Sequence, residues 1–163
     1  MNTFLLDKEY SRKYELAFAE KFDKYMDGVK INDGRSDDFG VDISINYIIN
    51  IDVKCYRKPL FIKSFDGAFI ETYLPKSGRK GWYNDPTKLT NAYIFVIDAE
   101  EDRLHYTKAY YIAKCDLERA VKHAEKECDL KYKKTASGWG FILPYNYLAE
   151  YGEELWLDNM QEN

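Results

Sequence analysis

Side chains able to face a core recur every three or four residues along residues 8–26, and this spacing predicts an amphipathic helix. These side chains are Ser11, Tyr14, Phe18, Phe22, Tyr25 and Met26. Gly28 follows the segment and is the expected C-cap. At about 100° per residue, Glu15 falls inside the apolar stripe, between Phe22 and Met26. That carboxylate either extends to water from the stripe edge or belongs to a site on this helix face.

The hydrophobic period changes to two after Gly28, which predicts strands. The expected order is a strand at residues 29–31, a polar loop at 32–38, and strands at 41–45 and 49–54. In the last strand, three apolar side chains alternate with Asn50, Asp52 and Lys54. One face of this strand therefore belongs to the core, and the other faces solvent or carries chemistry.

The remaining pattern predicts a mixed sheet with helices beside it. A strand is expected at residues 92–98, where residues 92–97 form an unbroken apolar run, which is typical of a strand buried on both faces. Further strands are expected at 61–65, 68–74, 104–107, 110–112 and 141–143, a long irregular loop up to residue 91, a helix at 116–127, and a helical turn after Pro144. We therefore predict one α/β domain over residues 1–149, with a central mixed β-sheet flanked by α-helices, and an acidic, frayed tail over 150–163.

Composition agrees with a single folded domain. The chain has 163 residues, of which 45% are hydrophobic and 32% charged, so it can bury a sizeable core and is not expected to be disordered. Its longest apolar run, residues 92–97, is far shorter than the roughly 20 residues that span a bilayer. The start lacks the features of a signal peptide, so we expect a cytoplasmic protein. Cys55, Cys115 and Cys128 lack metal-site spacing and are expected to be reduced and structural.

Charge is unevenly distributed along the chain. The net charge is −4, made up of −4 over residues 1–53, +5 over 54–88 and −5 over 89–163. An acidic chain is not expected to coat DNA non-specifically, but a basic segment beside carboxylates fits an enzyme that handles a phosphodiester. A solvated, lysine-rich loop is the alternative interpretation.

Asp42, Asp52 and Lys54 form the most informative group of polar residues. Asp42 stands ten positions before an Asp-x-Lys sequence on the next predicted strand, so paired strands bring the three side chains together. This convergence needs paired residues whose numbers are both even or both odd, for example 42 opposite 52 and 44 opposite 50, which leaves an odd-length loop at 46–48. Two carboxylates can hold Mg²⁺, and a neighbouring lysine can orient the attacking water and stabilise charge in the transition state.

This pattern resembles the PD-(D/E)XK nuclease superfamily, which has the restriction-endonuclease-like fold. The resemblance covers the first helix, the strand pair and, more loosely, residues 92–128. It implies that Asp42, Asp52 and the Val53 carbonyl bind the metal and that Lys54 acts on the water. Many members carry a glutamate on the first helix that helps to bind metal, and Glu15 matches it.

Two features depart from the fuller pattern of that superfamily. Val41 stands where proline is common, and the Gln-x-x-x-Tyr motif of some branches is absent. The second departure leaves exonuclease and endonuclease activity open, and we expect an endonuclease.

The predicted function is therefore a Mg²⁺-dependent nuclease, with Mn²⁺ as a substitute metal. DNA is the expected partner, RNA is left open, no membrane is involved, and the enzyme either stands alone or cuts both strands as a homodimer. The basic segment is expected to contact nucleic acid through Arg57, Lys58, Lys76, Arg79, Lys80 and the ring of Trp82. The rival hypothesis is a catalytically silent module of the same fold that binds nucleic acid or a protein partner.

Overall fold

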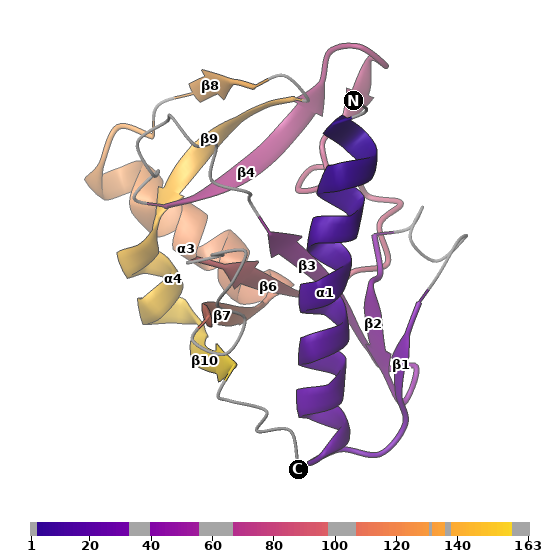
Figure 1. Cartoon of the computed structure of the whole chain (residues 1–163). Coiled ribbons are helices and arrows are strands. Elements are labelled where there is room, and N and C mark those ends of the chain that lie inside the picture. The colour runs from indigo at the N-terminus through magenta and orange to yellow at the C-terminus, as the bar shows by residue number, and fades with distance from the viewer. Residues whose placement is uncertain are drawn as a thin grey trace.

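The main feature of the structure is a six-stranded mixed sheet (Figure 1). The computed structural model describes residues 3–32, 40–55, 67–97, 107–130, 132–135 and 138–157, with side chains from residue 10 onward except at 107. Strands lie in the order β1 (Val29–Ile31), β2 (Ile43–Ile45), β3 (Ile49–Cys55), β6 (Ala92–Val96), β7 (Thr107–Ala113) and β10 (Glu153–Leu157). Among these, β3 and β6 run parallel, and the other neighbours are antiparallel.

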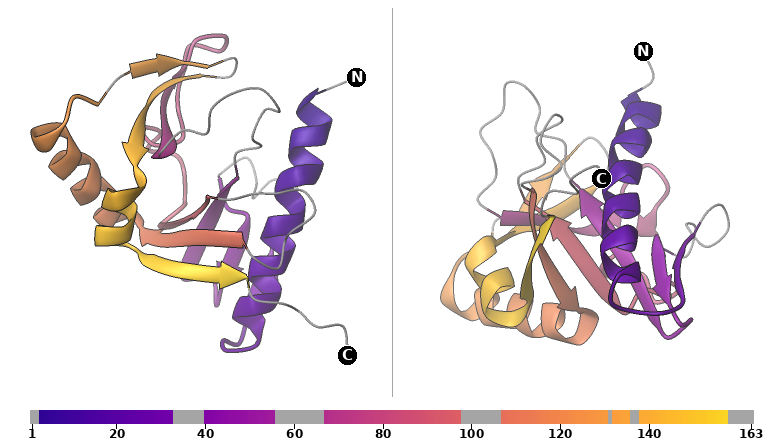
Figure 2. Two further views of the ribbon diagram at one scale, coloured as in Figure 1. Left: turned by 60° about the vertical axis from the view of Figure 1, so that its left-hand side comes forward. Right: turned by 60° about the horizontal axis from the view of Figure 1, so that its bottom comes forward.

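A second, smaller sheet lies beside the main one (Figure 2). Its strands are β5 (Arg79–Lys80), β4 (Gly67–Leu74), β9 (Trp139–Pro144) and β8 (Tyr132–Lys134), in that spatial order. All three pairings in this sheet are antiparallel. The described residues thus form a mixed α/β structure, with three helices: α1 (Thr3–Asp23), α3 (Lys114–Glu127) and α4 (Tyr145–Tyr151).

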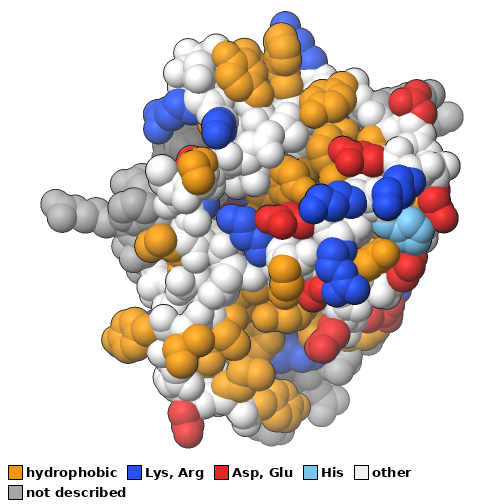
Figure 3. Space-filling view, turned by 180° about the vertical axis from the view of Figure 1, so that it is seen from behind, with side chains coloured by type: hydrophobic (Ala, Val, Ile, Leu, Met, Phe, Trp, Pro, Cys, Tyr) orange, Lys and Arg blue, Asp and Glu red, His pale blue; other side chains and the backbone are white. Residues whose placement is uncertain are grey.

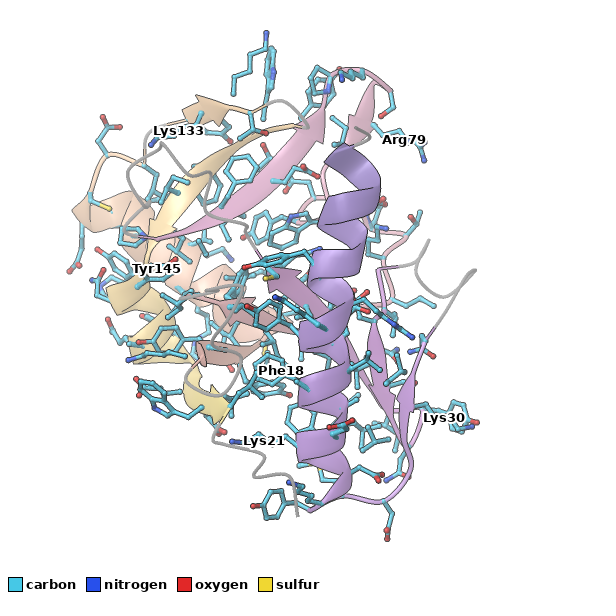
Figure 4. All side chains as sticks on the ribbon, viewed as in Figure 1. Phe18, Lys21, Lys30, Arg79, Lys133 and Tyr145 are labelled. Carbon is cyan, nitrogen blue, oxygen red and sulfur yellow. The ribbon has the colours of Figure 1, made fainter. Side chains whose placement is uncertain are left out.

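The main sheet separates two hydrophobic cores. On one face, α1 packs Tyr14 and Phe18 against Ile51 of β3, and Phe18 points toward the sheet in Figure 4. On the other face, Tyr93 and Phe95 of β6 pack with α3, α4 and the inner side of the second sheet. Strand β6 is buried throughout, as the unbroken apolar run predicted. Burial on both faces explains why that strand has no polar alternation.

The register of β2 and β3 agrees with the sequence prediction. Ser44 lies opposite Asn50, and residues 46–48 form the odd-length turn. Asn46 and Tyr47 adopt left-handed backbone angles, with φ of 50° and 58°. The predicted alignment of the two strands is therefore confirmed up to the pair that joins residues 43 and 51.

Helix α1 differs from its predicted boundaries. It begins at Thr3 and ends at Asp23, so Tyr25 and Met26 lie beyond it and are 80% and 45% exposed. The carbonyl of Phe22 accepts hydrogen bonds from the backbone N–H groups of both residues, which ends the helix one turn before Gly28. The prediction that these two side chains complete the apolar stripe is wrong.

Residues 150–157, the first part of the predicted acidic tail, are not frayed as predicted, and residues 158–163 lie outside the described residues. Helix α4 continues through Glu150 to Tyr151, and residues 153–157 form β10, paired with β7. Leu155 and Leu157 alternate onto the α1 core, where Leu157 is only 5% exposed. This burial, together with an ion pair between Glu154 and Lys108, stabilises a strand where the acidic composition suggested a tail.

Other predictions have mixed outcomes. The three cysteines are free, but Cys115 is exposed and so is not a packing residue. The short strand β8 was not predicted, and the expected strand at 61–65 lies outside the described residues. No helix in the described part of the chain is both long and apolar enough to cross a membrane.

Candidate active site

Asp52 and Lys54 lie on β3 and face away from α1. Their partners in the parallel ladder are Tyr93 and Phe95, which belong to the core on the side of the second sheet. The Lys54 Nζ lies 2.6 Å from Asp52 Oδ2, and the two side chains are only 19% and 6% exposed. Alternation along β3 thus places this ion pair between the main sheet and the segments that cover it.

Asp42 lies at the end of β2 and is joined to β3 by its side chain. Its Oδ2 accepts a hydrogen bond of 2.6 Å from the Val53 backbone N–H, and its own N–H donates to the Ile51 carbonyl at 2.8 Å. At the bend beside β2, the Asp42 carboxylate therefore accepts the Val53 N–H in place of a backbone carbonyl. Because the N–H and C=O of a strand residue point the same way, the Val53 carbonyl also points to the side of β3 on which Asp42 lies.

The pKa of Asp42 is raised to about 8. Burial is the main cause, because it disfavours the charged form, and the negative charges of Asp52 and Glu15 add to the increase. The Lys54 ammonium and the hydrogen bond from Val53 act in the opposite direction. Because Lys54 is already paired with Asp52, ionising Asp42 adds a negative charge to the site that a divalent cation would stabilise.

Glu15 lies on the opposite side of the main sheet from Asp52 and Lys54. Its Oε2 accepts a hydrogen bond of 3.0 Å from Arg12 Nη1 on the same helix, and its side chain is 13% exposed. The charge of Glu15 nevertheless reaches Asp42, whose pKa it raises. The structure thus brings Glu15 into electrostatic range of the site, with Arg12 as its direct partner.

Trp82 covers Lys54. The Lys54 Nζ lies 4.9 Å from the centroid of the Trp82 ring, a cation–π distance, and the ring packs against Tyr93 at 4.9 Å. Trp82 is half-buried, so it forms part of the site wall instead of an exposed contact. Beneath it, the buried Tyr93 hydroxyl has no hydrogen-bond partner among the described residues.

One further charged residue near the site, Glu71, was not singled out from the sequence. Glu71 on β4 has a raised pKa, mainly through burial, and both Lys54 and Lys88 lower it. A hydrogen bond from the Trp82 backbone also holds the Glu71 carboxylate. A glutamate within an apolar strand of the basic segment was the available sequence signal, but only the pairing of β4 with β9 shows where it lies.

Gly40 permits a close approach beside Asp52. It has a φ of 71°, and a Cβ atom there would lie 2.9 Å from Lys88 Cδ and 3.5 Å from Asp52 Oδ2. The Thr90 hydroxyl donates a hydrogen bond to the Gly40 carbonyl, which holds this turn against the loop that carries Lys88. Glycine is favoured at this position both by its backbone angle and by the space available.

The expected nucleic-acid contacts are only partly at this site. Lys76, Arg79 and Lys80 are exposed on the β4–β5 hairpin, and Figure 4 shows Arg79 at the far end of the second sheet. Arg57 and Lys58 lie outside the described residues. The hairpin residues therefore form a surface separate from the ion pair of Asp52 and Lys54.

The donor atoms near Asp42 and Asp52 are suited to Mg²⁺. Two carboxylates and the Val53 carbonyl supply hard oxygen ligands. Within the described ranges, however, no three His, Cys, Asp or Glu side chains are grouped closely enough to hold a metal ion. A bound cation would therefore take its remaining ligands from water or substrate, as Mg²⁺ commonly does.

Comparisons with known proteins add no assignment. Searches against protein-family models, curated proteins and solved structures each found no match to this chain.

Proposed function

We propose that the protein is a Mg²⁺-dependent nuclease that hydrolyses phosphodiester bonds in DNA, as an endonuclease, in the cytoplasm. The observation that supports this most directly is the joining of two strands at one point, with Asp42 bonded to the Val53 backbone and Asp52 paired with Lys54. These are the residues that the resemblance to the PD-(D/E)XK superfamily assigns to metal and water. The restriction-endonuclease-like fold is part of the same proposal.

The chain order supports this fold assignment. A long helix is followed by the antiparallel β2–β3 pair, and β3 then pairs in parallel with β6. Strand β7 and helix α3 complete the arrangement. The residues that match the superfamily pattern lie on or next to the β2–β3 pair. The proposed fold and the proposed site therefore both depend on the register of these two strands.

Each residue has a distinct role in the proposed reaction. Asp42, Asp52 and the Val53 carbonyl would hold the cation, which when bound supplies Lewis-acid polarisation of the phosphate and of a water molecule. Lys54 would orient the attacking water and stabilise negative charge on the phosphoryl oxygens. Water adds to phosphorus as the P–O bond to the leaving group breaks. One proton of the water passes to solvent, and the leaving oxygen takes a proton from solvent to become a hydroxyl group.

A cleavage assay tests this proposal. Purified protein is incubated with labelled single-stranded, duplex and branched DNA in Mg²⁺, Mn²⁺ or EDTA. We expect cleavage with either metal and none in EDTA. Lys108→Ala is a matched control, because Lys108 forms an ion pair with Glu154 at the edge of the same sheet, and this variant should cleave like the wild type.

The silent-module hypothesis has one observation in its favour. Lys54 and Arg12 already neutralise Asp52 and Glu15, so two of the carboxylates are paired without a cation. If DNA is bound but remains uncut in both metals, this second function replaces the nuclease.

A further inference from the structure

Four residues form a continuous row across the second sheet. Lys80 lies opposite Tyr73, Tyr73 opposite Trp139, and Trp139 opposite Lys134. Directly opposite residues of antiparallel strands point to the same face, so two aromatic rings are flanked by two lysines on one side of the sheet. We name these four residues the aromatic row.

The rings of the aromatic row are available to a ligand. Tyr73 and Trp139 are 39% and 42% exposed, and their centroids lie 5.8 Å apart in an edge-to-face arrangement. Lys134 Nζ lies 5.7 Å from the Trp139 centroid. Tyr132, which is 70% exposed, lies opposite Phe141. Phe141 is two positions from Trp139 on β9 and therefore shares its face of the sheet, so Tyr132 is the next aromatic residue on that side.

The surroundings of the row are basic although the chain as a whole is acidic. In the described strands of the second sheet and the β4–β5 turn, Glu71 is the sole acidic residue. The basic residues there are Lys76, Arg79, Lys80, Lys133 and Lys134. Figure 3 shows hydrophobic and basic side chains side by side at the end of the molecule where β5 and β8 lie, and Figure 4 shows Arg79 and Lys133 on its two outer strands. This charge is complementary to a phosphate backbone.

The row faces the same side as the candidate active site. It shares its sheet face with Phe141, which contacts Tyr83 at a centroid distance of 6.3 Å. Tyr83 contacts Trp82, and Trp82 covers Lys54. A series of aromatic contacts therefore joins Phe141, which shares the sheet face of the row, to the lysine assigned to the water.

We propose that the aromatic row binds single-stranded DNA and leads that strand to the site of Asp52 and Lys54. Unpaired bases stack on Tyr73 and Trp139, while Lys80 and Lys134 contact the adjacent phosphates. A duplex fits this surface poorly, because its bases are stacked on one another and present only their edges. The inference rests on the proposed nuclease function for its substrate, and it adds strandedness and a binding surface.

Binding in EDTA tests the row without cleavage. Fluorescence anisotropy is measured for the full chain with a labelled single-stranded DNA oligonucleotide, a duplex of the same sequence and the matching RNA strand. We expect the DNA strand to bind more tightly than the duplex or the RNA. Trp139→Ala should weaken binding of the DNA strand by about 5- to 150-fold, and Trp139→Phe should restore most of it.

The chain offers a close control for this substitution. Trp156 on β10 is 44% exposed and has Lys108 Nζ at 5.5 Å from its ring, so it matches Trp139 in exposure and in cation–π contact, but it lies on the main sheet. Trp156→Ala should leave DNA binding unchanged. Because Lys80 and Lys134 are exposed, their double substitution by Gln should keep the fold and reduce the slope of log K against log salt by about 1.4.

Three results would overturn the inference. These are equal binding of single-stranded DNA by the Trp139→Ala and Trp156→Ala variants, tighter binding of the duplex, and binding of the RNA strand as tightly as the DNA strand. If Trp139→Ala does not fold, an unchanged salt slope in the double lysine variant overturns the inference instead. A separate Mg²⁺ cleavage assay distinguishes the two proposals, since cleavage without any effect of the row refutes only the row, and row-dependent binding without cleavage refutes only the nuclease.

Discussion

The carboxylate of Asp42 accepts a hydrogen bond from the backbone N–H of Val53 at 2.6 Å, so the first aspartate of the site is fixed to the strand that carries the second. This bond makes the position of Asp42 depend on the register of β3. A change in the β2–β3 turn that shifts this register would therefore move Asp42 relative to Asp52 at the proposed metal site.

Asp52→Asn should separate metal binding from folding. The substitution removes a proposed ligand charge, and we expect Mn²⁺ affinity to fall at least 10- to 100-fold and cleavage to be lost. It also lowers the pKa of Asp42, which the charge of Asp52 raises. Calorimetric titration of Mn²⁺ and thermal unfolding measure the two effects, and wild-type metal affinity in this variant would exclude Asp52 as a ligand.

Lys54→Ala should give the opposite result for metal. Removing a cation beside Asp52 leaves the ligands in place, so Mn²⁺ affinity should be unchanged or higher. The cleavage rate should fall by about 10²–10³-fold, because the transition-state charge loses its partner. Single-turnover cleavage at saturating metal measures this, and an unchanged rate would assign Lys54 a structural role.

Glu15→Gln should have a smaller effect than either change at the site. Glu15 is bonded to Arg12 across the main sheet from Asp52, so its influence reaches Asp42 through charge. We expect cleavage to fall less than about tenfold, with little change in stability. A loss as large as that of Asp52→Asn, measured in the same assay, would show that Glu15 is a metal ligand.

The contribution of Asp42 to the stability of the metal-free protein should decrease as the pH rises from about 4 to about 8. The pKa of Asp42 is about 8 in the folded chain and near 3.8 when unfolded, so the folded state binds the extra proton between these values. This contribution is fully present below about pH 4 and is lost as the pH rises through about 8. Urea unfolding in EDTA at pH 5 and 8.5 should show a larger decrease for the wild type than for Asp42→Asn, and equal decreases would contradict the assignment.

Gly40→Ala tests the close approach beside Asp52. Gly40 and Gly78 both have left-handed angles, but a Cβ at Gly78 would meet nothing within 4 Å, whereas at Gly40 it would meet Lys88. Both substitutions should cost about 1–2 kcal/mol from the backbone, and Gly40→Ala should cost more. Only Gly40→Ala should reduce cleavage, and equal unfolding free energies for the two variants would show that the crowding at Gly40 is relieved at no cost.

Local patterns predicted the β2–β3 pair, while longer-range features escaped prediction. Strand alternation and the odd-length turn were sufficient to align Ser44 with Asn50. The face occupied by Glu15 depends on how α1 packs, and the place of Glu71 depends on β4 pairing with β9, which lies far along the chain. Neither relationship has a local sequence signal. At the acidic end, the many charged residues obscured the alternation of Leu155 and Leu157. The burial of these two side chains stabilises strand β10.

The pairing of β4 with β9 joins residue 67 to residue 144, so most of the chain must be synthesised before this contact can form. The β2–β3 hairpin, by contrast, closes over a three-residue turn. Non-local strand pairing is slow compared with local hairpin formation. A nascent chain would therefore carry the proposed metal ligands before it carries the DNA-binding surface, and it would gain the ability to capture a strand only near the completion of folding.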